Sequence, residues 1–268
     1  MAIAEVPANA LSARERALLL VPLASSLVLG LLAYEVPLAF ARLASGGAGD
    51  PLIARLAGAA TLGYAAALVH ALYRRVWAAA RLPVLATLAF SVASLFACLA
   101  ALFSGGGQPL TYLILLLALA CGGSAAVMLR ARRAEARPPA DVAPWLVWFV
   151  LGATVLSVPF GLLPLLAPAA FARAFGLPGA GVFVYRWGGA ALAGYAVLGV
   201  FELRSRAWTE IRSAAVMVVV FNGLGAIACA LVLLGALRDA PGSLAGLALA
   251  AGALVAVATG VELARDGN

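Results

Sequence analysis

Three charged residues border apolar runs of the sequence, and they are the strongest candidates for a binding site. Glu35 follows one run, Arg55 precedes another, and Arg186 comes directly after the segment VFVY. Ionisable groups within reach of hydrocarbon are costly and often mark ligand or ion sites. We expect Glu35 to pair with Arg55 or Arg186, which would leave the other arginine for an anionic ligand. The alternative is that each arginine extends its side chain to a membrane surface.

A second candidate is the pattern R-x-W-x-x-x-R, which occurs twice. Its residues are Arg75, Trp77 and Arg81 in the first copy, and Arg206, Trp208 and Arg212 in the second. Arginine and tryptophan at helix ends are typical of orientation charges beside an interfacial aromatic belt. The same groups would also suit an anionic lipid headgroup. Both interpretations remain open.

Residues for redox, metal or hydrolytic chemistry are scarce. His70 is the only histidine, and it is a weak candidate for binding haem or chlorophyll because no second ligand accompanies it. The three cysteines form no C-x-x-C pair, so no metal site is expected. The motifs H-E-x-x-H, G-x-S-x-G and the P-loop are also absent. We expect no catalytic centre and no cofactor.

The composition indicates that these residues are carried by membrane-spanning helices. Of 268 residues, 65% are hydrophobic and 11% are charged, which is about half the charged fraction of a soluble domain. Apolar segments of about 20 residues match the thickness of a bilayer, where only helices or closed barrels satisfy the backbone. The sequence predicts an all-α integral membrane protein with eight spans, over residues 16–36, 55–73, 82–103, 109–130, 144–167, 181–203, 212–235 and 243–262.

The chain contains an internal repeat. Residues 37–104 align with residues 168–235 without a gap at a constant offset of 131, and Tyr64, Trp77 and Cys98 are among the identities. A four-span unit returns the chain to its starting side, so two such units point the same way and any symmetry axis lies along the membrane normal. We expect a first four-helix repeat over residues 1–131, a cytoplasmic linker over 132–141 and a second four-helix repeat over 142–268.

Two features of the repeat predict local structure. The segments PLAFARLASGG and PAAFARAFGLPG begin with proline and end with glycine, which predicts short interfacial helices with Phe40 and Phe171 turned toward lipid. The pairs Ala59–Gly63 and Ala190–Gly194 have the small-x-x-x-small spacing that lets helices approach closely. This seam favours packing within one bundle, with a dimerisation face as the alternative.

The net charge of +7 comes from 18 arginines and reflects topology rather than nucleic-acid binding. With eight spans, 13 arginines lie on the side of the termini and 5 on the other, which places both termini in the cytoplasm of a cell whose inner (plasma) membrane holds the protein. Anionic lipids are the expected partners. The larger group comprises Arg14, Arg16, Arg74, Arg75, Arg81, Arg130, Arg132, Arg133, Arg137, Arg204, Arg206, Arg212 and Arg265.

Each half resembles the small bacterial four-helix membrane proteins of the DoxX-like kind. The resemblance covers the number and order of spans, together with P-x-A-F-A-R and a later R-x-x-G-A-A-x-x-G-Y, both of which occur in each half. It implies a four-helix bundle, here duplicated, and an accessory role beside respiratory or redox complexes. It implies no catalytic residue.

These observations favour a polytopic protein that serves as an accessory or scaffolding subunit of a membrane complex, with other membrane subunits as partners. The alternative is a carrier for a small apolar or amphiphilic solute or a lipid, because duplicated parallel bundles also occur among transporters. A carrier requires a midplane cavity, whereas a scaffold is packed dry there.

The arginine asymmetry gives a direct test of topology. Single cysteines placed at the linker prolines Pro138 and Pro139 of a cysteine-free variant should resist an impermeant thiol reagent added outside intact cells. They should react once the membrane is permeabilised. Labelling of the linker from outside would contradict the cytoplasmic placement.

Overall fold

A computed structural model describes residues 9–47, 49–132, 142–177, 181–235 and 242–265. These residues form ten α-helices, eight long and two short. The long helices coincide with the eight predicted segments to within a few residues. The helices are α1 (Ala13–Glu35), α2 (Pro37–Ser45), α3 (Pro51–Arg74), α4 (Trp77–Phe103), α5 (Pro109–Ala131), α6 (Pro144–Leu166), α7 (Pro168–Ala174), α8 (Val182–Ser205), α9 (Trp208–Leu233) and α10 (Gly242–Arg265).

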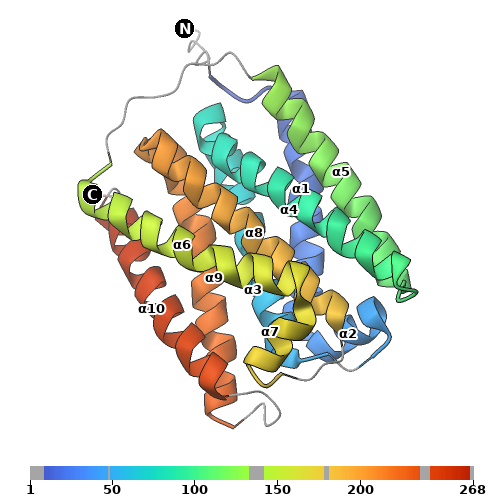
Figure 1. Ribbon diagram of the computed structural model, residues 1–268. Helices are drawn as coiled ribbons and strands as arrows, with labels where there is room; N and C mark the ends of the chain where they lie inside the picture. The colour runs from blue at the N-terminus through green and yellow to red at the C-terminus, as the bar shows by residue number, and fades with distance from the viewer. Residues whose placement is uncertain (1–8, 48, 133–141, 178–180, 236–241, 266–268) are drawn as a thin grey trace, which may run out of the picture.

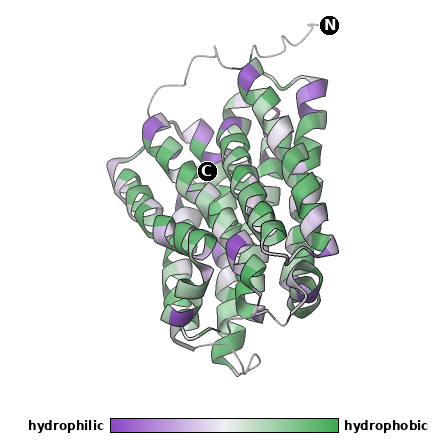
Figure 2. Cartoon of the chain, turned by 45° about the vertical axis from the view of Figure 1, so that its right-hand side comes forward, coloured by the Kyte–Doolittle hydropathy of each residue, from purple (hydrophilic) through white to green (hydrophobic). Residues whose placement is uncertain are grey.

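Seven helices are long and apolar enough to cross a membrane, namely α1, α3, α4, α5, α6, α9 and the Leu244–Ala264 part of α10. The chain is therefore an α-helical, multi-pass membrane protein. Figure 2 shows hydrophobic residues along the helices and hydrophilic ones mainly near their ends. Helix α8 is as long as α3 but does not meet the same criterion, and it carries Arg186 and Glu202 within its length.

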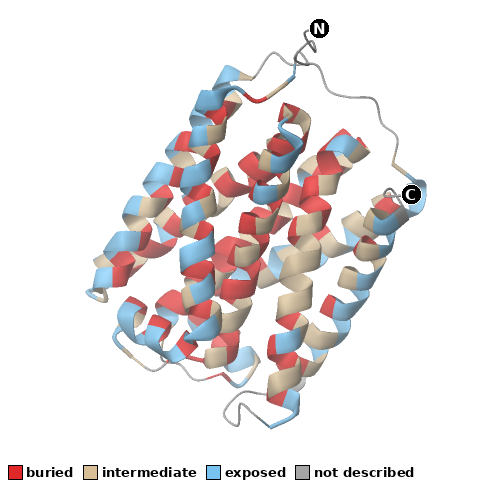
Figure 3. Ribbon diagram, turned by 180° about the vertical axis from the view of Figure 1, so that it is seen from behind, coloured by how far each residue is buried: buried red, intermediate tan, exposed pale blue. Residues whose placement is uncertain are grey.

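The centre of the bundle consists of α3, α4, α8 and α9. Helix α3 packs against α9, and α4 packs against α8, while α1 covers α3 and α6 covers α8. Helices α5 and α10 lie against α4 and α9. In Figure 1, α2 and α7 lie together at the end opposite to the start of α1. Buried residues gather on the central helices in Figure 3, and exposed residues lie on the outer ones.

Several helix bounds recur at the offset of 131. Helix α1 covers residues 13–35 and α6 covers 144–166, while α3 covers 51–74 and α8 covers 182–205. Arg75 and Arg206 both end their helices in the left-handed conformation, with φ of 57° and 52°. Their carbonyls accept hydrogen bonds from the amides of Leu11 and Val142, which also differ by 131.

The short segments after α1 and α6 are helical, as the proline and glycine positions predicted. Pro37 and Pro168 occupy the first turns, and Gly46 closes α2 with a φ of 69°. The orientation predicted for the two phenylalanines was wrong, because Phe40 and Phe171 are buried. The Phe40 ring lies 5.0 Å from that of Trp187, since α2 lies against α3 and α8 and turns its apolar face inward.

Helices α3 and α8 cross closely through a reciprocal pair of contacts. The Tyr64 hydroxyl donates to the Ala191 carbonyl at 2.8 Å, and the Tyr195 hydroxyl donates to the Ala60 carbonyl at 3.0 Å. A Cβ atom on Gly63 would collide with the Tyr195 hydroxyl, and one on Gly194 with the Tyr64 hydroxyl. The small-residue seam therefore serves packing within the chain, which agrees with the favoured interpretation.

The reciprocal contact predicts equal effects of two conservative substitutions. Tyr64→Phe and Tyr195→Phe should each lower the free energy of unfolding by about 0.6–1.7 kcal/mol, because each removes the main interhelical hydrogen bond of one hydroxyl. The Tyr195 hydroxyl also has a longer contact of 3.4 Å with the Met217 carbonyl. Unfolding in mixed micelles with a denaturing detergent would measure the loss. Tyr73→Phe is the control, because Tyr73 is 80% exposed. A clear loss in only one of the two variants, or an equal loss in the control, would contradict the prediction.

Candidate functional site

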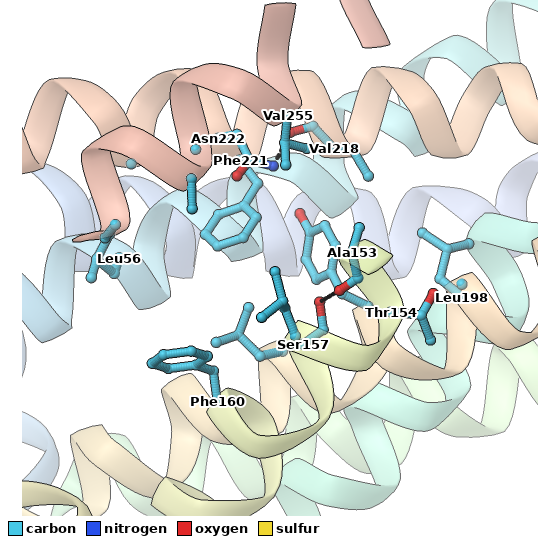
Figure 4. A pocket seen from close by; sticks show the side chains of 18 of the residues that line it. Leu56, Ala153, Thr154, Ser157, Phe160, Leu198, Val218, Phe221, Asn222 and Val255 are labelled. Atoms are coloured by element: carbon cyan, nitrogen blue, oxygen red, sulfur yellow. Dashed lines mark hydrogen bonds between the residues drawn. The ribbon is translucent and has the colours of Figure 1, made fainter. Parts of the chain in front are cut away.

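A cavity of about 330 Å³ lies between α6, α8, α9 and α10. Ligand pockets in proteins begin at about this size. Ile53, Leu56 and Ala57 of α3 also line it, so both halves of the chain contribute. Figure 4 shows side chains of α6 on one side of the cavity and side chains of α9 and α10 on the other. We call this cavity the α6–α10 pocket.

The corresponding place in the first half is almost closed. A cavity of about 30 Å³ lies there, and most of its lining residues match lining residues of the α6–α10 pocket at the offset of 131. Phe90 and Phe221 are one such pair, and Ser26 and Ser157 are another. Helix α1 also packs against α5, whereas α6 and α10 make no comparable contact. The two cavities are therefore counterparts that differ in size.

Residue size accounts for the difference. Trp187, fully buried, fills the space beside the small cavity, and its counterpart Leu56 lines the large one. Gly252 of α10 stands where the first half has Cys121. Each exchange places the smaller side chain beside the larger cavity. Close packing elsewhere in a protein core leaves few voids larger than a water molecule, so the open volume is a specific feature of this copy.

The walls of the pocket are mainly apolar. The hydroxyls of Thr154 and Ser157 donate to carbonyls of their own helix, at 2.7 and 2.8 Å, and so are already satisfied. The amide nitrogen of Asn222 donates to the Val218 carbonyl at 2.8 Å. Its carbonyl oxygen faces α10, 3.4 Å from where a Cβ atom on Gly252 would lie. This lining suits hydrocarbon, with one amide oxygen near the middle.

Glu202 lies at one end of the pocket and has no visible partner. Its side chain lines the cavity, the residue is 7% exposed, and it forms no hydrogen bond or ion pair with any described residue. Trp208 and Glu262 line the same end, close to the start of α9 and the end of α10. Tyr185 lines the opposite end. From Tyr185 to Glu202, α8 rises by about 25 Å at 1.5 Å per residue, so the pocket is elongated along the helices.

The predicted pairing of Glu35 with Arg55 or Arg186 was wrong. Glu35 is exposed at the end of α1 and forms no ion pair with either arginine in the described structure. The Arg55 Nε donates instead to the Tyr34 carbonyl at 3.1 Å, so the end of α1 supplies a backbone partner. The Arg186 Nε is buried and has no described hydrogen-bond partner.

The R-x-W-x-x-x-R residues are dispersed rather than gathered into one site. Arg81 donates to the carboxylate of Glu210 at 2.7 Å, which joins α4 to α9. Trp77 is buried, so it cannot lie in an interfacial aromatic belt.

Arg75 and Arg206 are exposed at the ends of α3 and α8 and remain accessible to lipid headgroups. In the second copy, Trp208 lines the α6–α10 pocket and Arg212 is half-buried with a partner of its own.

His70 has a structural contact across the two halves. Its Nδ1 lies 2.8 Å from the Ser213 hydroxyl oxygen, which links α3 to α9. The described residues contain no group of three histidine, cysteine or acidic side chains that would hold a metal ion. Among the described residues, His70 therefore has no second side chain beside it that would help to bind haem or chlorophyll.

Sequence reasoning missed the residues that matter most at the pocket. Glu202 and Glu210 are separated by a turn and belong to different environments, which their spacing alone does not reveal. A usable signal was present, because Glu202 interrupts the apolar run VLGVFEL where its counterpart in the first half is Ala71. A charge that appears in only one copy of a repeat marks a position where the copies have different tasks.

Comparisons of the chain with protein-family models, with curated proteins and with solved structures find no match. The case for function therefore depends on the geometry of the α6–α10 pocket.

The buried pair of Arg81 and Glu210 predicts a large effect on stability. Glu210 is 1% exposed and also accepts a hydrogen bond from the Ser205 hydroxyl at 2.6 Å. Glu210→Gln should lower the free energy of unfolding by about 3–5 kcal/mol, because it leaves a partly buried guanidinium without its counter-ion. Glu35→Gln, at an exposed acid, should change it by less than about 0.5 kcal/mol.

A double-mutant cycle separates the pair from the individual side chains. Adding Arg81→Gln to Glu210→Gln should recover part of the lost stability, because the unpaired charge is then removed. Additive losses in the cycle would show that the two side chains act independently.

Proposed function

We propose that the chain is an eight-span membrane protein made of two parallel four-helix repeats, related by a pseudo-twofold axis along the membrane normal. The support is the recurrence of helix bounds at an offset of 131 and the reciprocal contacts of Tyr64 and Tyr195. In a twofold interface, a contact from one unit is mirrored by the same contact from the other. Helix α8 is then the eighth span, and its charged residues lie toward its two ends.

The same proposal sets the orientation in the membrane. The termini and the linker over residues 132–141 lie in the cytoplasm, because 13 of 18 arginines belong to that side. Apart from Arg132, the linker lies outside the described residues. Glu202 and the end of α10 are then on the cytoplasmic side, and α2 and α7 are on the outer side. The exposed Arg75 and Arg206 are placed to contact anionic headgroups of the cytoplasmic leaflet.

We propose that the protein binds an elongated apolar or amphiphilic molecule of the bilayer in the α6–α10 pocket and acts as its carrier. The main support for this proposal is a cavity of about 330 Å³ in the second half, at a place where the first half holds a cavity of only about 30 Å³. The lining is largely hydrocarbon, which excludes a hydrated ion path of the kind that charged solutes require. An apolar pocket of this size fits a lipid chain better than water.

A scaffolding role in a membrane complex is the second candidate. Its support is the aromatic packing between the halves, where the Tyr64 and Tyr195 rings lie 5.4 Å apart and the Phe90 and Trp187 rings lie 6.1 Å apart. No catalytic centre is proposed in either case. The DoxX-like resemblance implies an accessory role, which is in accord with this second candidate.

The test of binding introduces, beside the larger cavity, the tryptophan that stands at the equivalent position beside the smaller one. Leu56→Trp should fill the α6–α10 pocket as Trp187 fills its counterpart. Native mass spectrometry of the purified protein incubated with hexadecanol should show one bound molecule per wild-type chain, and occupancy should fall at least five-fold in Leu56→Trp.

The matched control is Val69→Trp, on the same helix at a position that is 53% exposed. This variant should bind hexadecanol as the wild type does, because its added ring lies outside the pocket. Equal occupancy in all three proteins would show that hexadecanol binds elsewhere and would favour the scaffold.

A further inference from the structure

We propose that the α6–α10 pocket selects amphiphiles with a cationic head, and that Glu202 is the residue that binds this head. The inference rests on the proposed function and adds the chemical class of the ligand. Its basis is a single carboxyl group, more than nine-tenths buried, that lines the pocket and has no partner among the described residues.

The surroundings of Glu202 make an unpartnered carboxylate unfavourable. Leu198 and Gly199 of the preceding turn line the same wall, and Ile211 of α9 lines the pocket near this end. A buried charge without a counter-ion or hydrogen bonds costs several kcal/mol, and proteins normally provide a partner. Arg81 is engaged with Glu210, and Arg206 is exposed at the end of α8, where its Nε donates to the Leu203 carbonyl at 3.2 Å. A cation carried by a ligand would supply the missing partner.

The repeat provides an internal comparison that supports this assignment. The counterpart of Glu202 is Ala71, which is fully buried, and the counterpart of Gly199 is Leu68, which is also fully buried. The closed copy therefore has neither the acid nor the space, and the open copy has both. An acid with only a structural purpose would be expected to have structural partners, as Glu210 has in Arg81 and Ser205.

The position of Glu202 agrees with a ligand whose polar head lies at the end of the pocket near the C-terminus of α8. Glu202 lies three residues before the end of α8, while the rest of the pocket extends along apolar walls toward Tyr185. A long-chain amine could place its ammonium at Glu202, near the proposed cytoplasmic surface, and its chain along α6 and α10. Charge-assisted hydrogen bonds of this kind are about twice as strong as neutral ones. Glu262 lines the same end but has an interaction of its own, so Glu202 is the acid assigned to the head.

The experiment compares heads on an identical chain. The purified protein is incubated with equimolar hexadecylamine, hexadecanol and hexadecanoic acid, and bound species are counted by native mass spectrometry. The wild type should bind the amine at least ten-fold more than the alcohol and bind the acid least. In Glu202→Gln this preference should fall to about two-fold or less, with hexadecanol still bound. Glu35→Gln should keep the wild-type preference.

The outcomes separate the two proposals. If the wild type binds hexadecanol but shows no preference for the amine, the proposed selection of a cationic head is wrong, whereas the proposed binding of apolar chains in the pocket is not contradicted. A preference for the amine that persists in Glu202→Gln places the cation elsewhere and overturns the role of Glu202. If hexadecanol does not bind, or binds equally to Leu56→Trp, the proposed pocket function itself fails. Should Glu202→Gln not fold, the wild-type preference and Glu202→Asp, which retains the charge and should retain a preference, still test the inference.

Discussion

Helices in a bilayer come close only where their side chains are small, and the crossing of α3 with α8 depends on this constraint. Gly63 and Gly194 leave the space into which the opposite tyrosine hydroxyl fits. Each hydroxyl then finds a backbone carbonyl on the other helix, so neither tyrosine hydroxyl is left unsatisfied at the crossing. The positions of α4 and α9, which pack on this crossing, follow from it.

A duplicated core of this kind allows the outer helices to diverge. The central contacts bind both halves equally, so a change in an outer helix of one copy leaves the crossing intact. The first copy closes through the packing of α1 on α5 and through Trp187, whereas the second stays open beside Leu56. The stability supplied by four central helices thus permits a cavity in the second half, where a single four-helix bundle would lose a large share of its packing.

The helices could be predicted because the bilayer imposes a length and an apolar composition that are visible residue by residue. The ends of the long helices agree with the prediction to within about five residues. The site could not be predicted in the same way. The pocket arises from side-chain volume that is absent, and the partner of Arg81 lies 129 residues away on another helix. The inward turn of Phe40 likewise depends on Trp187, which belongs to the other half.

The route into the pocket follows from the same packing. Helix α6 has exposed apolar residues that include Val155 and Leu162, and α10 has Leu254 and Val257, so both present apolar surface to lipid. Helices α6 and α10 make little contact with each other, which leaves a boundary between them beside the pocket. In the proposed carrier, a ligand entering at this boundary would stay in hydrocarbon and would lose hydration only at its head. Water, by contrast, would gain few hydrogen bonds along this wall, since Thr154 and Ser157 already bond within α6. In the proposed carrier, the pocket would exchange its ligand with the bilayer rather than with the aqueous phases, and selection among lipids would fall to the polar end where Glu202 lies.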